Sequence, residues 1–120
     1  MNFEQLEERV VAWAAARNII PNSNAMSQAL KTAEEVVELL QALNKKDEKE
    51  TIDAYADILI TLIIGCRLSG YNLVSCLEAG YDVIKNRTGY LGPDGIFYKS
   101  DGHLEKELDH GASKNRQDGK

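Results

Sequence analysis

The run Ile58-Leu59-Ile60-Thr61-Leu62-Ile63-Ile64 constrains the fold of this chain more than any other feature. It is far too short to span a bilayer, so it has to be buried within a protein. It falls in a helix predicted over about Lys49–Ser69, which is apolar on every side from Ile58 onward. We therefore expect this helix to be enclosed, either inside a helical bundle or at a subunit interface.

Hydrophobic periodicity and helix-breaking residues predict three more helices. They cover about Phe3–Arg17, Ala25–Asn44 and Asn72–Asn86, with Asn24 or Ser23 as a candidate cap of the second and Asn72 as a candidate cap of the last. Beyond residue 87 the chain is rich in glycine, and Ile96-Phe97-Tyr98 is compatible with a short strand or an extended arm. The prediction is an all-α, four-helix bundle-like domain over residues 1–99. A short non-helical C-terminal extension follows over residues 100–120, and we expect it to be largely disordered.

Composition narrows the range of partners and compartments. The net charge of -5 gives no electrostatic support for binding nucleic acid or an anionic membrane surface. Glu4, Glu7 and Glu8 come too early for an apolar signal core. We therefore expect a cytoplasmic protein with no nucleic-acid or membrane partner. Cys66 and Cys76 form no metal-ligand or redox spacing, and we interpret them as buried free thiols.

Acidic residues form two clusters on neighbouring predicted helices. The first is Glu34-Glu35-x-x-Glu38, and the second is Asp53-x-x-x-Asp57. At about 100° per residue, the first three share a helix face opposite the apolar positions. Taken alone, this pattern is typical of a solvated amphipathic helix.

Asp57 changes the interpretation of these clusters. It lies on the stripe that continues into Ile60, Ile64 and Leu68, so we expect it at the edge of a buried column rather than on a wet face. A carboxylate beside a core needs a compensating cation, and Lys31 alone cannot neutralise five acids. Carboxylates on two facing helices are suitable ligands for a hard divalent cation such as Mg²⁺.

Other site types are excluded by what the chain lacks. Di-iron helical bundles use Glu-x-x-His pairs, but both histidines, His103 and His110, lie in the C-terminal extension. There is no Gly-x-x-x-x-Gly-Lys phosphate loop, and the helical region offers no histidine for nucleophilic catalysis.

The two acidic clusters also carry a family resemblance. Lys31-x-x-Glu34-Glu35-x-x-Glu38-Leu39 followed by Asp53-x-x-x-Asp57-Ile58-Leu59 resembles the MazG-like, all-α nucleoside triphosphate pyrophosphohydrolases, over roughly residues 3–99. The short stand-alone branch found in bacteria and phages is the most similar. The resemblance implies hydrolysis of a nucleoside triphosphate to the monophosphate and pyrophosphate with Mg²⁺, or Mn²⁺ in its place.

The resemblance also implies a role for each candidate site residue. The principal metal ligands are Glu35, Glu38, Asp53 and Asp57. Glu34 is the catalytic candidate, as general base toward the attacking water or as ligand of a second metal. The candidates for substrate binding are Lys31, Lys85, Asn86 and Arg87, although Lys85 and Arg87 are equally explained as complements to a helix dipole.

One departure from the family pattern leaves two questions open. The usual second motif is Glu-x-x-Asp, but Ala54 stands three residues before Asp57. Asp53 keeps the same helix face, and Glu50-x-x-Asp53 matches the spacing one turn earlier, so either Glu50 or Asp53 is the fourth ligand. One metal or two would fit. The departure also motivates the alternative hypothesis of a noncatalytic nucleotide- or protein-binding module on the same helical fold.

Two further expectations concern the substrate and the assembly. Phosphoribosyl-ATP pyrophosphohydrolases of the same superfamily are disfavoured, because Asp57-Ile58-Leu59-Ile60-Thr61 replaces their Asp-Leu-Leu-Tyr-His-like segment. A domain this short has too little chain to wrap a wholly apolar helix. We therefore predict a homodimer or homotetramer, with that helix near the interface and an active site that draws on two subunits.

Overall fold

The computed structural model describes residues 1–100. These residues divide into two compact units, Met1–Glu78 and a second that begins at Ala79. The predicted disorder of residues 101–120 lies outside the described residues.

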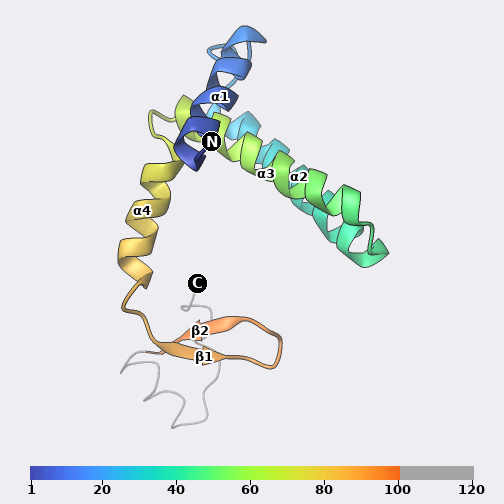
Figure 1. The fold of residues 1–120 in the computed structure, drawn as a ribbon, viewed down its shortest axis with the longest axis vertical. Helices are drawn as coiled ribbons and strands as arrows, with labels where there is room; N and C mark the ends of the chain where they lie inside the picture. Colours follow the sequence, from blue (N-terminus) through green and yellow to red (C-terminus); the bar gives the residue numbers. More distant parts are fainter. Residues whose placement is uncertain (101–120) are drawn as a thin grey trace. The chain divides into compact units, whose positions relative to one another are not determined.

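Four helices account for most of the described chain, which confirms the predicted all-α fold. They are α1 (Phe3–Ala16), α2 (Ala25–Lys45), α3 (Glu48–Leu68) and α4 (Leu73–Ile84) (Figure 1). α4 ends earlier than predicted, because the N–H of Arg87 bonds to the carbonyl of Ile84 in a tighter turn. Lys85, Asn86 and Arg87 therefore follow the helix.

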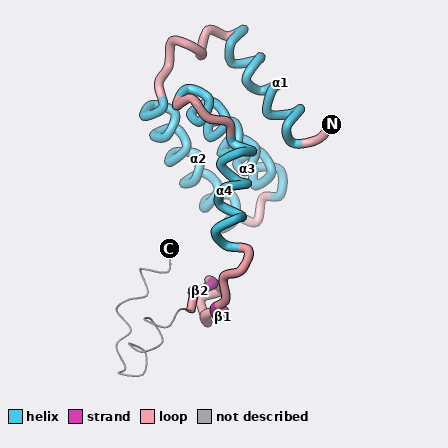
Figure 2. Tube along the Cα trace, turned by 90° about the vertical axis from the view of Figure 1, so that its left-hand side faces the viewer, coloured by secondary structure: helices cyan, strands magenta, loops and turns pink. Residues whose placement is uncertain are grey.

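Polar caps and a left-handed residue define the α2–α3 hairpin. The Asn24 side chain accepts a hydrogen bond of 2.8 Å from the Ser27 N–H, as expected for a helix cap. Lys46 ends α2 in the left-handed conformation (φ 58°), and Asp47 then caps α3 through the Glu50 N–H. Because so short a turn joins them, α2 and α3 lie side by side and antiparallel (Figures 1 and 2).

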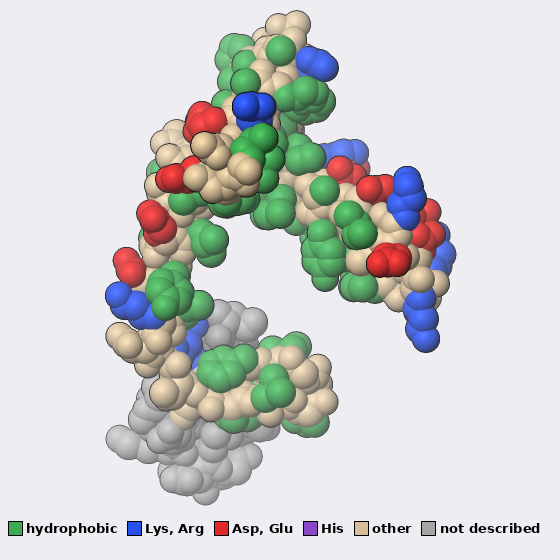
Figure 3. All heavy atoms as spheres, viewed as in Figure 1, with side chains coloured by type: hydrophobic (Ala, Val, Ile, Leu, Met, Phe, Trp, Pro, Cys, Tyr) green, Lys and Arg blue, Asp and Glu red, His purple; other side chains and the backbone are tan. Residues whose placement is uncertain are grey.

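The enclosure predicted for α3 is only partly present within one chain. Ile63 and Ile64 are buried, but Leu59 and Leu62 are 44% and 39% exposed. The buried hydrophobic residues are few and mostly small: Ala14, Ala42, Ala54, Ile63 and Ile64. Hydrophobic side chains lie open to solvent along the hairpin (Figure 3). Enclosure of α3 inside a single-chain bundle is therefore wrong, and the subunit interface stays the prediction.

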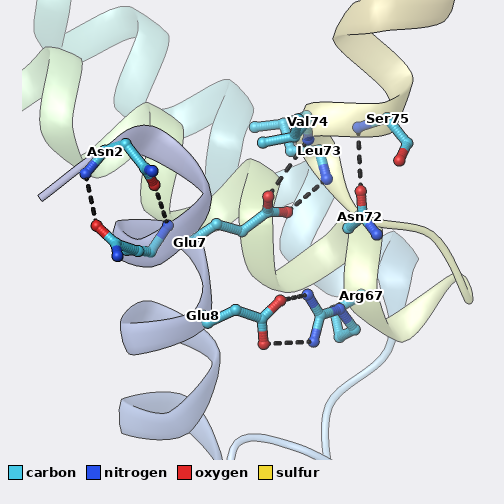
Figure 4. A network of polar contacts seen from close by, with 9 residues as sticks. Asn2, Glu7, Glu8, Arg67, Asn72, Leu73, Val74 and Ser75 are labelled. Carbon is cyan, nitrogen blue, oxygen red and sulfur yellow. Dashed lines mark hydrogen bonds and ion pairs between the residues drawn. The ribbon is translucent and has the colours of Figure 1, made fainter.

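Two neighbouring acids of α1, Glu7 and Glu8, bind the start of α4 and the end of α3 (Figure 4). Glu7 is only 2% exposed, and its carboxylate accepts the N–H groups of Leu73 and Val74 at 2.5 and 3.3 Å. These donors belong to the first turn of α4, where a helix has unpaired N–H groups and favours negative charge. Glu8 forms a two-pronged ion pair with Arg67 near the end of α3. Arg67 lowers the pKa of Glu8, chiefly through this hydrogen bond.

The second unit contains the end of α4 and a β-hairpin. β1 (Gly89–Leu91) pairs antiparallel with β2 (Phe97–Lys99), with Tyr90 opposite Tyr98. The two tyrosine rings stack at 5.6 Å between centroids. The short strand considered for residues 96–98 is thus present as β2.

Within residues 1–100, no single helix has both the length and the apolar composition needed to cross a membrane, and only the bent pair α3 and α4 meets that test together.

Candidate metal and nucleotide site

The α2–α3 hairpin brings acids of both clusters to one cavity. The cavity has a volume of about 410 Å³ and is lined by Glu38, Gln41, Glu50, Asp53, Ala54 and Asp57. Since the helices run antiparallel from the turn at Lys46, the second half of α2 faces the first half of α3. Three of the expected metal ligands, Glu38, Asp53 and Asp57, therefore line the same space.

Glu35 is the most deeply buried acid of this region. It is 6% exposed, and its Oε1 atom is buried without a hydrogen-bond partner. The other oxygen lies 3.7 Å from Lys31 Nζ. Burial raises the pKa of Glu35, and the charges of Glu38 and Asp57 raise it further, while Lys31 opposes them. A buried carboxylate oxygen without a partner is costly, so this atom calls for a cation or a proton.

The donor set suits a hard divalent cation, although the side chains do not yet converge. Every candidate offers carboxylate oxygen, which Mg²⁺ and Mn²⁺ prefer, and like charges crowd around the unpartnered oxygen of Glu35. Across residues 1–100, however, no group of three His, Cys, Asp or Glu side chains is placed to hold a metal ion as it stands. By chemistry the residues fit the cation, and their individual roles as ligands stay predictions.

Lys31 forms a cationic arm beside the first acidic cluster. Its Nζ lies 3.2 Å from Glu34 Oε1, and both side chains are more than half exposed. The hydrogen bond to Glu34 raises the pKa of Lys31, and the charges of Glu34, Glu35 and Glu38 add to the effect. Lys31 is therefore cationic over the whole neutral range.

Asp57 differs from the expectation drawn from its helix position. It is exposed, although it lines the cavity together with Glu38 and Asp53. The prediction that Asp57 lies at the edge of a buried column rather than on a solvated face is therefore wrong for the single chain.

The structure is compatible with either Asp53 or Glu50 as the fourth ligand. Asp53 lies 3.8 Å from Lys49, and Glu50 lies 3.3 Å from Lys45. Both acids line the cavity and both are more than half exposed.

The predicted phosphate-binding residues after α4 belong to the second unit. Lys85 pairs with Asp82 at 3.3 Å, and Arg87 is half-buried. Asn86 is exposed. Their contact with a substrate stays a prediction.

Two features of the first unit were missed from the sequence. Gln41 lines the cavity, and its position three residues after Glu38 on the same helix was the available signal. The interpretation of Cys76 as a buried thiol is wrong, since it is exposed, and Cys66 is only partly buried. Their positions, ten residues apart across the α3–α4 turn, give no recognisable motif.

Comparison with known proteins identifies the family. Residues 6–79 match the family model described as phosphoribosyl-ATP pyrophosphohydrolase, and this range contains both acidic clusters. No curated protein and no solved structure matches the chain. The matched family is part of the MazG-like all-α superfamily, so the superfamily inferred from the acidic motifs is confirmed, while the stand-alone branch stays a prediction. The chain belongs to the phosphoribosyl-ATP pyrophosphohydrolase family.

Proposed function

We propose that this chain is a nucleotide pyrophosphohydrolase that depends on a divalent cation, Mg²⁺ or Mn²⁺, and cleaves a nucleoside triphosphate to the monophosphate and pyrophosphate. The family supports hydrolysis of a nucleotide with release of pyrophosphate. The observation that carries the metal dependence is the buried, unpartnered Oε1 of Glu35 next to the charges of Glu38 and Asp57. A purely structural acid at this position would be expected to have a hydrogen-bond donor.

Each residue of the proposed site has a task that its position allows. Glu35, Glu38 and Asp57 hold the cation, together with Asp53 or Glu50. When bound, the cation neutralises phosphate charge and activates water for attack. Glu34 is exposed beside these acids, so it can accept the proton of the attacking water. Lys31, and in the same proposal Lys85, Asn86 and Arg87, bind the pyrophosphate oxygens.

A second candidate substrate is phosphoribosyl-ATP, and the family match favours it. The segment Asp57–Thr61 favours the nucleoside triphosphate instead, because it lacks the Tyr-His-like end typical of phosphoribosyl-ATP enzymes. Both substrates have the same triphosphate chemistry at the cleaved bond, so the proposed roles of the acids apply to either.

Pyrophosphate release from purified protein tests the activity. The substrates are the ribo- and deoxynucleoside triphosphates and phosphoribosyl-ATP, each with Mg²⁺, with Mn²⁺ and with chelator. We expect turnover of at least one substrate, loss of turnover with chelator, and a loss of about 100-fold or more in Glu38→Gln. Glu48→Gln is the matched control, since Glu48 is an exposed acid of α3 that does not line the cavity. Turnover that survives Glu38→Gln would contradict the assignment.

Calorimetry separates the enzyme from a noncatalytic binding module. Binding of Mg²⁺ with a nonhydrolysable nucleotide, but no turnover of any substrate, would favour the module. Binding of the metal alone has its own readout, because a ligand of the folded state raises the free energy of unfolding. We expect Mg²⁺ to raise the melting temperature of the wild-type protein and to have no such effect on Glu35→Gln.

The proposal includes a homodimer or homotetramer located in the cytoplasm. Both helices of the hairpin leave large apolar side chains exposed, and single exposed residues of this kind are common but long stripes are not. On α2 these are Val36, Val37, Leu40 and Leu43, and on α3 they are Ile52, Tyr55, Leu59 and Leu62. A second copy that covers these stripes would pack on the side of α3 opposite Asp57.

A further inference from the structure

Cys66 and Cys76 face each other across the α3–α4 turn. Their Sγ atoms are 3.4 Å apart, although the residues stand ten positions apart in the chain. Cys66 is near the end of α3, and Cys76 lies in the first part of α4. Both belong to the compact unit Met1–Glu78. No substrate, metal or fold role proposed for this chain uses either thiol.

We propose that Cys66 and Cys76 are a site of oxidative modification, at which a hydroperoxide converts the two thiols into an intrachain disulfide. The sulfur atoms are already in contact, and a disulfide at about 2.05 Å requires them to approach by little more than 1 Å. Rotation of the two side chains about their Cα–Cβ bonds is the movement that the proposal requires.

Exposure sets the order of the chemical steps. Cys76 is exposed, so its thiolate attacks the peroxide, the O–O bond breaks, and the products are a sulfenic acid on Cys76 and a water molecule or an alcohol. Cys66 then attacks the sulfenic sulfur, forms the S–S bond and releases water. In total the two thiols lose two electrons and two protons, and the peroxide is reduced to two molecules of water or to water and an alcohol.

The surroundings of Cys66 explain why it acts second. Burial raises the pKa of the Cys66 thiol to about 11, with smaller contributions from the hydrogen bond to Cys76 and from nearby charges. Cys66 is therefore a poor first nucleophile toward a reagent in solution. Its contact with Cys76 compensates, because the second step takes place within one chain and needs no encounter.

The bond would join two elements that are otherwise held by polar contacts. In the reduced chain the start of α4 is fixed by Glu7, and the end of α3 is fixed by the Glu8–Arg67 ion pair. Cys66 also lines an apolar cavity of about 340 Å³ with Gly65 and Leu73. A disulfide would add a covalent link across the α3–α4 turn, next to that cavity.

Peptide mapping provides a direct test, because Arg67 separates the two cysteines. Trypsin cleaves after Lys49, Arg67 and Lys85, so Cys66 and Cys76 fall on peptides 50–67 and 68–85. The full chain is treated with hydrogen peroxide, blocked with a thiol alkylating reagent and digested without reductant. We expect the intact monomer to lose about 2 Da and both free thiols, and the two peptides to appear joined. Reductant should restore both thiols.

The matched control is a variant in which the second cysteine is moved from position 76 to position 75. The double variant Ser75→Cys, Cys76→Ser keeps two thiols but turns the second onto another face of α4, since neighbouring helix positions differ by about 100°. Ser75 is exposed, and its side chain makes no hydrogen bond that the change would remove. We expect the joined peptide to fall to background in this variant.

Three results would overturn the proposal. The first is a joined peptide of equal yield in the control. The second is a wild-type chain whose cysteines gain oxygen atoms independently rather than losing hydrogen. The third is a disulfide that forms only between chains, visible as a dimer on a non-reducing gel.

Discussion

At the scale of single residues, the buried carboxylate of Glu35 lowers the free energy of unfolding when it is charged. A bound metal ion would remove this cost. Its raised pKa means that the folded state binds the Glu35 proton more tightly than the unfolded chain does. Below the ordinary pKa of 4.5 the residue is protonated in both states and costs nothing. As pH rises through the folded pKa, the buried group becomes charged and the free energy of unfolding falls.

Glu35→Gln should therefore stabilise the metal-free protein at neutral pH. The gain should shrink as pH falls below the folded pKa of Glu35 and should vanish near pH 4, since both forms are then neutral. Glu34→Gln is the control, because Glu34 is exposed and pairs with the same lysine. Thermal unfolding with chelator across this pH range measures the effect. A variant that is less stable than wild type at every pH would show that Glu35 is held by favourable contacts.

Glu7 is the opposite case, an acid that is buried with its partners in place. Glu7→Ala leaves the N–H groups of Leu73 and Val74 without an acceptor and opens a small cavity. We expect the free energy of unfolding to fall by about 2–3 kcal/mol in urea titrations. Glu8→Ala, at the next position, should cost clearly less, because the Glu8 carboxylate is exposed to water and salt. Equal losses from both would contradict the capping role of Glu7.

At the scale of helices, Gly65 and Gly80 differ in the space that is available for an added side chain. A Cβ atom at Gly65 of α3 would lie 3.1 Å from the Gln28 Cβ on α2, whereas a Cβ at Gly80 of α4 would meet nothing within 4 Å. Alanine is favoured over glycine inside a helix by up to about 1 kcal/mol. Gly80→Ala should gain most of that amount, and Gly65→Ala should gain less because α2 and α3 would have to separate slightly.

The same substitution at both sites makes the comparison direct. Melting temperatures of the two variants, each with helix content checked by circular dichroism, test the order. A loss of stability in Gly80→Ala would be informative in itself, since it would mean that another chain packs against that side of α4.

Helices and their caps were predictable because their signals are local. Asn24 marks a helix end through its own chemistry, and the acids on α2 and α3 keep fixed angular relations along a rigid helix. The cavity that holds Glu38 and Asp53 follows from those relations and a short turn. Glu7 and Leu73 are 66 positions apart, and no local pattern connects a carboxylate to a distant N–H group.

At the scale of the whole molecule, the sequence could not show which surface covers the exposed apolar residues of α3. The pattern of α3 requires burial of Leu59, but it does not say whether the cover comes from the same chain or from another. In the single chain Leu59 is 44% exposed. The exposure of Asp57 is a separate matter, because residues two positions apart lie on nearly opposite sides of a helix.

Leu40→Glu combined with Leu59→Glu should convert the oligomer to a monomer. Leu40 on α2 and Leu59 on α3 are 61% and 44% exposed, and a charge at each would make burial against a second copy costly by several kcal/mol. Light scattering after size-exclusion chromatography should give a multiple of 13.3 kDa for the wild type and a single chain mass for the double variant. Helix content and melting in the variant report whether the single chain still folds.

Ser27→Glu is the control for this test, because Ser27 is exposed in the first turn of the same helix but lies about 140° from Leu40 around the helix axis. It should leave the mass of the assembly unchanged. If the active site draws on two subunits, pyrophosphate release should fall with the double variant and not with the control. A wild-type chain that is monomeric at all concentrations would contradict the shared interface.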